Sequence, residues 1–445
     1  MQLGMAFRRD PLGFLVRTAA RYGDASTFTA GRRQFFLLND PELIREVLVT
    51  KADQFTKSPA LRQAKVSLGE GLLTSEGDFH KRQRRLSQPA FHPSRVAGYA
   101  EAMVRRGREA ADRWRNAEVI ELHAEMMRLT LRVVADTLFS ASIDAEVDRI
   151  GQAMHVMVAM FTRARNPFAP LLNRLPLPSN YRFIRALSHV RGTVDRFIRE
   201  NRAAGIDRGD LLSRLVMARD TEDDDSGMSD IQLRDELLTL FTAGHETTAN
   251  ALTFTWRLLA SHPEVFAKLR AELDRELPGR DPSAEDVGRL VYTRAVIAES
   301  MRLFPPAWVL MREAKHEVVL GNGKYRLPAL SISILSQWIV HRDPRWWTDA
   351  EKFLPERWLD EQAKEARPRH AYFPFGGGPR NCIGESFAWM EAILLLATTA
   401  RTWRMRIVDD GPFRLVPTIT LRPRDPVKML LIQEGARTSP PASRL

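Results

Sequence analysis

Residues 373–384 read FPFGGGPRNCIG, and an apolar run follows them up to residue 397. Cys382 is the only cysteine in the sequence, so disulfides within the chain and zinc sites built from several cysteines are excluded. The glycines let the main chain approach a flat group closely. The apolar run predicts a helix that starts at the cysteine, and the positive end of a helix lowers the pKa of a thiol. The stretch therefore predicts a thiolate ligand; the alternative is a buried structural cysteine beside a tight turn.

A second unusual stretch, AGHETT at residues 243–248, lies inside a long helical pattern over residues 233–261. A glycine and two threonines are unfavourable inside a helix, so they need a reason. Gly244 removes a side chain where a planar cofactor or dioxygen would pass, although close packing against another helix is an equally good reason. The stretch also begins like the helix motif of zinc proteases, but Ala249 stands where that motif requires its second histidine.

Two further residues of this helix point to proton transfer. Ala243 and Thr247 are four residues apart and therefore lie on one face. The Thr247 hydroxyl can donate to a backbone carbonyl and open a groove that holds water. Glu246 places an acid beside this alcohol, and such a pair can relay protons. We therefore expect Thr247 and Glu246 to be the catalytic residues.

Two charged stretches complete the pattern. Residues 299–302 (ESMR) place a carboxylate and a guanidinium on one helix face, and Arg357 adds another arginine downstream. These residues predict a charge cluster with a structural role. Residues 77–85 form a basic helix start in which His80 and Arg84 share one face. This second stretch is either a solvated basic face or a binding site for an anion.

Together, the four stretches resemble motifs of the cytochromes P450, in the family's order, and the resemblance covers residues from about 24 to 423. It implies a mainly α fold with a small β-rich region, the cytochrome P450 fold, with haem b as cofactor and O2 as co-substrate. Cys382 would be the metal ligand, and the charge cluster would hold the surroundings of its loop in place. His80 stands where tryptophan is common in the family. The other cofactor-binding residues that the resemblance implies are Arg380, Phe375, Gly376, His80, Arg84, Arg312, Ala243 and Gly244.

Helical periodicity dominates the rest of the chain, and strand-like pieces are few and short. We expect helices at residues 101–116, 141–161, 181–203, 233–261, 263–277 and 295–303. We expect the small β-rich part from roughly residues 24–60, 315–340 and 415–433. Because these strands come from both ends of the chain, the sequence predicts a single haem domain over residues 1–445. The acidic segment over residues 220–230 is expected to be an exposed loop.

The resemblance also implies a substrate pocket over the distal face of the haem. Its expected residues are Leu68, Leu72, Phe161, Phe168, Leu240, Ala243, Trp308, Val309 and Ile419. Most of them are apolar, so we expect a lipophilic substrate such as a fatty acid, a terpenoid or a steroid-like molecule. The expected reaction is hydroxylation or epoxidation, in which one oxygen atom of O2 enters a C–H or C=C bond and the other leaves as water.

The sequence carries 66 Lys plus Arg against 55 Asp plus Glu, a formal charge of +11. Many basic residues fall in helical stretches that also carry acids, and no nucleic-acid motif accompanies them, so we expect no nucleic-acid partner. The apolar runs are too short to span a membrane, and the start of the chain lacks a secretory signal, which predicts a cytoplasmic protein. We expect a monomer. Electrons should come from a ferredoxin-type or flavodoxin-type partner with its NAD(P)H reductase, docking on Lys81, Arg82 and Arg85.

Two rival functions stay open at this point. One is a haem-thiolate enzyme that uses peroxide or isomerises its substrate without electrons from a reductase. The other is a haem sensor without turnover. The Thr247 and Glu246 pair speaks against both, because neither needs controlled proton delivery. Dependence of turnover on an external reductase would discriminate between them and a monooxygenase.

Overall fold

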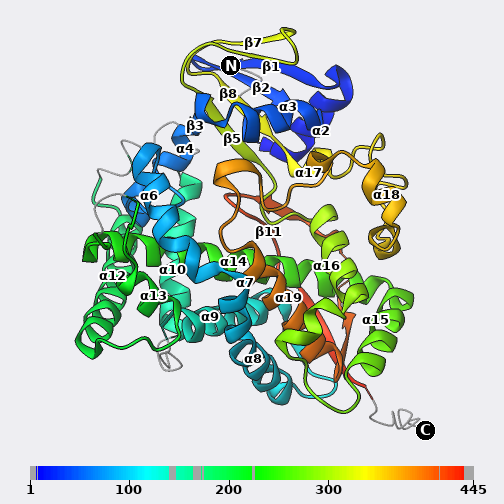
Figure 1. Ribbon diagram of the computed structural model, residues 1–445. Coiled ribbons are helices and arrows are strands. Elements are labelled where there is room, and N and C mark those ends of the chain that lie inside the picture. Colours follow the sequence, from blue (N-terminus) through cyan, green and yellow to red (C-terminus); the bar gives the residue numbers. More distant parts are fainter. Residues whose placement is uncertain are drawn as a thin grey trace.

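The computed structural model describes residues 9–139, 147–163, 175–222, 226–409 and 411–434, together with Phe7 and Leu172. Helices dominate, as the sequence predicts, and most of them lie below a small sheet in the view of Figure 1. The long helices are α2 (Pro11–Tyr22), α6 (Gly77–Ser87), α8 (Ala100–Arg113), α9 (Leu122–Phe139), α10 (Val147–Arg163), α12 (Pro178–Ala204), α14 (Asp230–Ser261), α15 (Pro263–Glu276), α16 (Val291–Leu303) and α19 (Glu385–Ala400). The short helices are α3 (Pro41–Arg45), α4 (Pro59–Arg62), α5 (Lys65–Leu68), α7 (Pro93–Val96), α13 (Leu211–Met217), α17 (Gln337–Val340) and α18 (Glu361–Ala366).

The six helices expected from the sequence correspond to α8, α10, α12, α14, α15 and α16, with ends that lie within a few residues of the expected ones. Residues 140–146, where the second of them was expected to start, lie outside the described residues. The periodicity identified α8, α12 and α15 because each buries one apolar face and exposes the other, whereas α14 and α16 are buried over most of their length.

The main sheet has five strands in the order β1-β2-β8-β5-β3. Its strands are β1 (Ala25–Ala30), β2 (Arg33–Leu38), β3 (Phe55–Lys57), β5 (Leu310–Ala314) and β8 (Ile332–Leu335). The N-terminal strands join the strands from later in the chain where β2 pairs with β8 in parallel, with Leu37 opposite Ile334. In Figure 1 this sheet lies at the top, where blue N-terminal strands and yellow-green later strands lie side by side. The expectation that strands from distant segments pair is therefore confirmed.

Three smaller sheets are formed from the remaining strands. They pair β12 (Lys428–Gln433) with both β4 (Val119–Glu121) and β9 (Trp403–Ile407), β10 (Leu415–Pro417) with β11 (Leu421–Pro423), and β6 (Val318–Leu320) with β7 (Tyr325–Leu327). Strands β5 and β9 lie outside the expected β regions, and so does β4. It has three residues between two helices, and its pairing partner is more than 300 positions away, so the local sequence pattern carries no signal for it.

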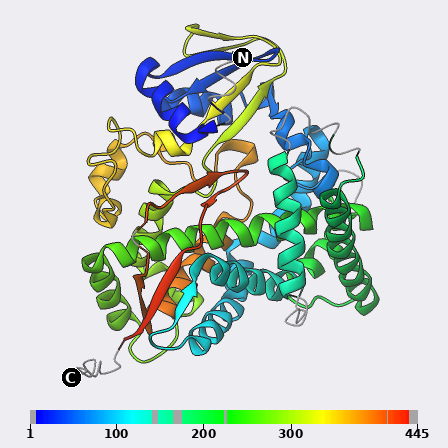
Figure 2. The same cartoon turned by 180° about the vertical axis from the view of Figure 1, so that it is seen from behind.

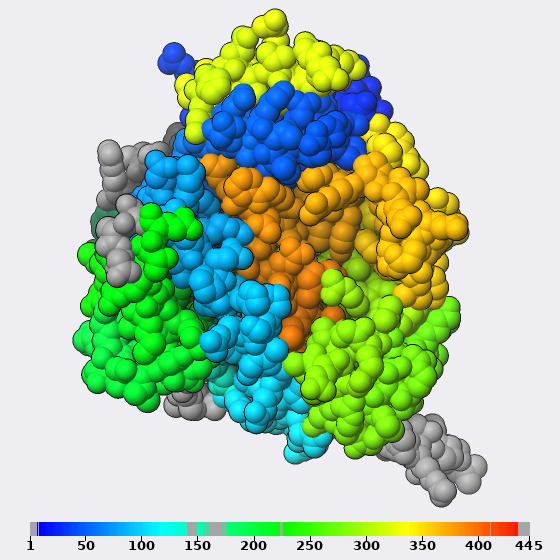
Figure 3. Space-filling model, viewed as in Figure 1, coloured from blue at the N-terminus to red at the C-terminus, as the bar shows by residue number. Residues whose placement is uncertain are grey.

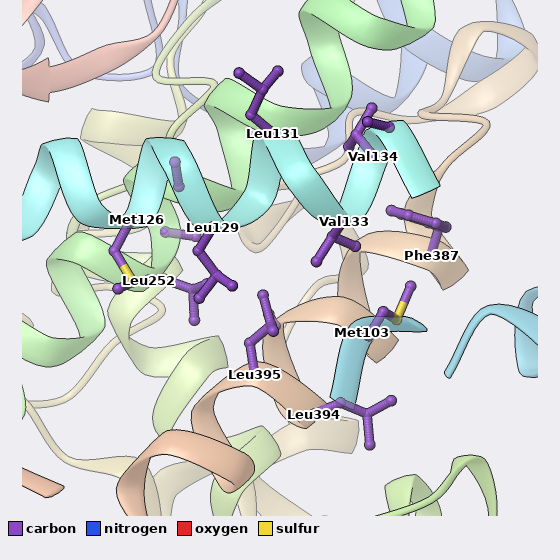
Figure 4. Packing of buried hydrophobic residues seen from close by; sticks show 14 of the residues in the cluster. Met103, Met126, Leu129, Leu131, Val133, Val134, Leu252, Phe387, Leu394 and Leu395 are labelled. Atoms are coloured by element: carbon purple, nitrogen blue, oxygen red, sulfur yellow. The ribbon is translucent and has the colours of Figure 1, made fainter. Parts of the chain in front are cut away.

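The helix α14 has 32 residues and crosses the molecule, as the long green helix of Figure 2 shows. It packs with α9 and α19 in the largest apolar cluster, to which Met126, Val133, Leu252 and Leu395 belong (Figure 4). Helix α19 is more apolar than α9, but its 16 residues are too few to span a membrane. Among the described residues, no helix is long and apolar enough to cross a membrane. The core therefore fixes α14 and α19, the two helices that carry the candidate site.

Candidate functional site

The cysteine loop precedes α19 and has a fixed shape. The Cys382 N–H donates to the Phe375 carbonyl at 2.9 Å. Gly376 and Gly378 have φ of +78° and +66°, in the left-handed region that favours glycine. A Cβ on Gly378 would lie 1.9 Å from the Leu48 carbonyl oxygen, so this glycine is required by the neighbouring main chain. Packing within the protein thus explains part of the glycine pattern.

Two expectations for Cys382 are wrong. Helix α19 begins at Glu385, with Gly384 as its N-cap, so the cysteine precedes the helix by three residues. Burial among protein atoms raises the pKa of the Cys382 thiol to about 11, while the Gly384 backbone and the Arg84 side chain act in the opposite direction. The helix end therefore does not by itself make a thiolate near neutral pH, and a bound metal cation would have to supply the missing stabilisation.

The cysteine nevertheless has open space beside it. Cys382 is exposed and borders a hollow of about 570 Å³, which residues 84–95 and 381–386 line in part. The protein crowds its other sides, which accounts for the desolvation of the thiol. In Figure 3 the orange segment around the loop reaches the surface between blue and yellow-green segments. The alternative of a structural cysteine enclosed in the core does not fit this exposure.

Beside the loop, four basic side chains surround one acid. Arg380 donates to Glu76 at 2.7 Å, and the Lys57 backbone N–H donates to the same carboxylate. Burial lowers the pKa of Lys57 to about 7, although Glu76 acts in the opposite direction. Burial also lowers the pKa of Arg312 to about 10 and that of His80 to about 4, with Arg380 adding to both shifts. We call Lys57, His80, Arg312 and Arg380, together with Glu76, the cation cluster. It holds more basic than acidic groups.

The cation cluster also contains unused hydrogen-bond donors, which tests whether haem propionates fit it. His80 Nε2 and Arg380 Nε are buried and lack a hydrogen-bond partner among the described residues. In β3 and β5 the register places Lys57 directly opposite Arg312, and like charges in such a pair repel. Two carboxylates would supply the missing acceptors and the missing negative charge. The residues present therefore fit a cofactor with two carboxylates.

Lys57 is a site residue that the sequence analysis missed. It is 4% exposed, and its Nζ donates to the carbonyls of Leu72 and Ser75 at 2.7 and 2.6 Å. A lysine that close to the core is rare unless it is paired. The only local signal would have been a lysine at the end of a short strand-like piece. That Lys57 lies opposite Arg312 is known only from the pairing of β3 with β5.

Arg84 lies at the cysteine loop. It donates to the Asn381 carbonyl at 2.8 Å and to the Asn381 side-chain oxygen at 2.6 Å. It therefore holds the residue that precedes Cys382. His80, one turn earlier on α6, is 7% exposed and lies 3.3 Å from the Ser75 hydroxyl through its Nδ1. The structure brings both residues to the site, His80 into the cation cluster and Arg84 onto the loop.

The middle of α14 carries an accessible face within an otherwise buried helix. Leu240, Gly244 and Thr247 are half-buried and Ala243 is exposed, whereas most of their neighbours in the helix are buried. The Thr247 hydroxyl donates to the Ala243 carbonyl at 2.7 Å, as expected. A Cβ on Gly244 would meet Val134 of α9 at 3.4 Å, an ordinary contact. Close packing against α9 therefore does not require this glycine, which favours the explanation by a ligand.

Glu246 is tied to the C-terminal hairpin. It is 6% exposed, and its Oε1 accepts from the Thr420 hydroxyl at 2.5 Å and lies 3.4 Å from the Arg422 guanidinium. The hairpin also carries Ile419, which is 43% exposed. Arg422 is a second residue that the sequence analysis missed, because nothing in its local sequence indicates a contact with α14. The acid beside Thr247 is thus held by groups from the far end of the chain.

The expected pocket residues are only partly open. Leu68 and Trp308 are buried, and the Trp308 indole N–H donates to the Thr418 carbonyl at 3.0 Å, so it packs between the helices and the hairpin. Leu72 is 9% exposed, and Val309 is half-buried. Phe168 and the side chain of Phe161 lie outside the described residues. The open part of the expected pocket is therefore the α14 face together with Ile419.

The predicted charge cluster is present. Arg302 and Glu299 are both fully buried, and their side chains form two hydrogen bonds of 2.8 Å. Arg357, in the 3-10 turn Pro355–Trp358, donates to the same carboxylate at 2.9 Å. The Trp358 indole donates to it as well. The cluster joins α16 to the segment that leads into the cysteine loop, which agrees with a structural role.

The basic surface expected to be a docking patch is less basic than the sequence indicates, and no contact of the described residues tests the docking itself. Lys81 pairs with Asp78 at 2.8 Å, and Arg85 and Arg82 pair with Asp220 at 2.8 and 3.3 Å. Asp220 is 2% exposed and folds back onto α6, so the expectation of an exposed loop fails at this residue, whereas Thr221, Glu222 and Ser229 are exposed as expected. The Asp220 carboxylate neutralises part of the basic surface, and these arginines have a structural partner.

Comparison with known proteins identifies the family. The model of the cytochrome P450 family matches residues 1–431. Cyclooctatin synthase of Streptomyces melanosporofaciens is 42% identical over 95% of this chain and 91% of its own length. Cyclooctat-9-en-7-ol 5-monooxygenase of the same organism is 39% identical over 91% of this chain and 87% of its own length. Pentalenene oxygenase of Streptomyces avermitilis is 36% identical over 93% of this chain and 91% of its own length.

The fold comparison agrees. The crystal structure of a cytochrome P450 superposes with a TM-score of 0.85 at 25% sequence identity, covering 96% of this chain and 98% of the other. The chain therefore belongs to the cytochrome P450 family and is a haem-thiolate monooxygenase that inserts one oxygen atom of O2 into a lipophilic substrate with electrons from a redox partner.

Proposed function

We propose that Cys382 is the axial ligand of the iron of haem b. It is the only cysteine of the chain, and its side chain borders a hollow on a loop of fixed shape. The observation that carries the proposal is the surplus of buried cations beside this loop, because haem has two carboxylates to satisfy them. Phe375 would shield the sulfur, and Gly376 would let the main chain approach the ring.

The residues of the cation cluster would bind the propionates. Arg312, Arg380, His80 and Lys57 supply buried donors there. Arg84 would reach a propionate through N–H groups that its two bonds to Asn381 do not use. Charge-assisted bonds of this kind are about twice as strong as neutral ones. They would therefore fix both the position and the orientation of the ring.

The bound haem-thiolate group supplies the oxygen chemistry, since a thiolate ligand favours cleavage of the O–O bond. The accessible α14 face, with Ala243 and Gly244, would lie against the distal side of the ring. The Thr247 hydroxyl, already donating to the Ala243 carbonyl, can accept a hydrogen bond from a water molecule in the groove. Glu246 would pass protons to that water, and its bonds to Thr420 and Arg422 would hold it in position.

We propose a cyclic terpenoid as the substrate. The support is the similarity to relatives whose names state such substrates, one a hydrocarbon, pentalenene, and one an alcohol, cyclooctat-9-en-7-ol. The apolar side chains of Leu240 and Ile419, both accessible, suit such a molecule. Electrons would come from a ferredoxin-type or flavodoxin-type protein with its NAD(P)H reductase. We also propose that residues 1–445 form one domain and that the protein acts as a cytoplasmic monomer.

Two measurements test the proposal. The reduced protein with carbon monoxide should absorb near the wavelength that names the family, and Cys382→Ala should abolish that band. A band typical of histidine-ligated haem in the freshly purified protein would refute thiolate ligation by Cys382. A panel of terpenoids should then shift the haem spin state on binding, and turnover should require the reductase. Turnover with peroxide alone, at the same rate, would favour the peroxide-using alternative.

A further inference from the structure

Two buried polar groups in the N-terminal half of α14 have no use in the proposed mechanism. Glu236 is fully buried, and its Oε2 accepts from the Leu72 N–H at 2.9 Å. Its other oxygen, Oε1, has no hydrogen-bond partner among the described residues. The hydroxyl of Thr239, one turn further on and 3% exposed, also lacks a partner there. Orphaned polar groups of this kind are costly, so a native protein keeps them for a reason.

Their position relates them to the substrate. Residues at intervals of three or four share a helix face, so Glu236 lies on the same face as Leu240, Ala243 and Thr247. The rise of a helix places Glu236 about 10 Å along the axis from Ala243. Thr239 lies at the edge of this face, and a Cβ on Gly71 would come within 2.2 Å of its hydroxyl. The two groups therefore lie where α14 meets loop 69–75, at the buried end of the helix face that carries Leu240 and Ala243.

The chemistry of the pair is that of a hydrogen-bond donor. Burial raises the pKa of Glu236 to about 8, although the Leu72 N–H and the Lys57 charge act in the opposite direction. Near neutral pH the carboxyl group is therefore mainly protonated. Since Oε2 already accepts a hydrogen bond, the proton belongs on Oε1, which then donates. The Thr239 hydroxyl can donate or accept beside it. Such a pair suits a hydroxyl or carbonyl oxygen of a ligand.

We propose that Glu236 and Thr239 bind an oxygen atom that the substrate already carries. The proposal rests on the terpenoid class proposed above and narrows it to alcohols or ketones. The bound oxygen lies about 10 Å from the carbon that is oxidised beside Ala243, across a polycyclic skeleton of ordinary size. An earlier reaction must therefore supply the substrate. For an alcohol it would be either a hydroxylation or a cyclisation that ends with the addition of water, and for a ketone the two-electron oxidation of such an alcohol by a dehydrogenase would follow.

A change at Asp235 provides a matched control that tests whether Glu236 has only a structural role. The neighbouring Asp235 holds the same loop, because its Oδ2 accepts from the Glu70 N–H at 2.8 Å. Asp235 lies on a different face of α14 from Leu240 and Ala243, since adjacent residues are turned by about 100°. If the carboxylates only clamp the loop, changes at Asp235 and Glu236 should have the same effect. If Glu236 binds substrate oxygen, only its own change should alter the preference for oxygenated ligands.

The experiment measures dissociation constants for the haem-loaded protein by calorimetry, which does not depend on turnover. The probes are pairs of 15-carbon and 20-carbon terpenoids with the same skeleton, such as cedrene and its alcohol cedrol. We expect the parent protein to bind the alcohol roughly tenfold more tightly than the hydrocarbon. Glu236→Met should bring this ratio close to one. Thr239→Val breaks no hydrogen bond of the structure and should lower the ratio several-fold, whereas Asp235→Asn should leave it unchanged.

The outcomes separate the two proposals. Equal binding of alcohol and hydrocarbon by the parent, or an alcohol preference that survives both Glu236→Met and Thr239→Val, refutes the oxygen site and leaves the terpenoid class intact. A ratio that falls equally in Asp235→Asn shows that the loop clamp alone matters and also refutes it. Binding of none of the pairs refutes the terpenoid class together with the oxygenated ligand proposed for Glu236.

Discussion

Glu391 allows a test of the electrostatics of the core. It lies in α19, is fully buried, and neither carboxyl oxygen is hydrogen-bonded within the described part of the chain. Burial raises its pKa to about 8, while the nearby Thr248 side chain acts in the opposite direction. The variant Glu391→Gln keeps the shape of the side chain but removes the ionisation. The difference between variant and parent therefore isolates the cost of a titrating group in this position.

The pKa values fix the size and sign of the effect. In the unfolded chain the group titrates near 4.5, and in the folded protein near 8. Because the folded pKa is raised, its contribution to stability is fully present below pH 4.5 and is lost as the pH rises towards 8. Linkage gives a cost of about 1 kcal/mol at pH 5 and about 3 kcal/mol at pH 7. The stability of the variant relative to the parent should thus grow by about 2 kcal/mol between these two pH values.

The assay is urea unfolding of the haem-loaded protein, followed by circular dichroism at pH 5, 6 and 7. Comparing the two proteins at each pH removes the contributions of all other groups that titrate. Glu264→Gln provides the control for the loss of a surface carboxylate, because Glu264 is exposed in the first turn of α15. A difference for Glu391→Gln that stays constant from pH 5 to pH 7 would refute the reasoning.

Three further predictions concern other groups of the site. Thr247→Ala should keep its haem but form less product per electron and more hydrogen peroxide; an unchanged ratio of product to electrons would exclude a role in proton delivery. Arg302→Met should lower the free energy of unfolding by about 3 kcal/mol, because it removes two charge-assisted hydrogen bonds from the fully buried Glu299 carboxylate and leaves Arg357 as its remaining charged partner; urea midpoints measure this, and a loss below 1 kcal/mol would contradict it. Lys57→Met should speed the transfer of haem to apomyoglobin several-fold, whereas an unchanged rate would remove Lys57 from the propionate site.

Local sequence patterns predicted most of the fold. The helices α8, α12 and α15 bury one face each, and this periodicity predicted their positions to within a few residues. The start of α19 was placed wrongly because Ile383 and Gly384 continue the apolar run, although the glycine acts as the N-cap. The raised pKa of Cys382 was missed for a related reason. A sequence shows the dipole of the following helix but not the desolvation by segments that pack around the sulfur.

The missed residues all depend on contacts between distant segments. Lys57 belongs to the site because β3 pairs with β5, and Arg422 because the C-terminal hairpin folds onto Glu246. The same reason explains why the sequence overstated the basic charge of α6, since Asp220 reaches this helix across more than 130 positions. No local pattern distinguishes a paired arginine from a solvated one, because the pairing is decided by tertiary packing.

Helix α14 shows why the unusual residues of the sequence gather where they do. Glu236, Gly244, Glu246 and Thr247 are each unfavourable in a buried helix, through desolvation or low helix propensity. The helix is held regardless by apolar packing against α9 and α19. Sequences that break local rules without loss of fold do so at functional sites. One rigid helix would therefore hold the carboxyl group proposed to bind oxygen and the pair proposed to handle protons at a fixed spacing, which substrate binding cannot change.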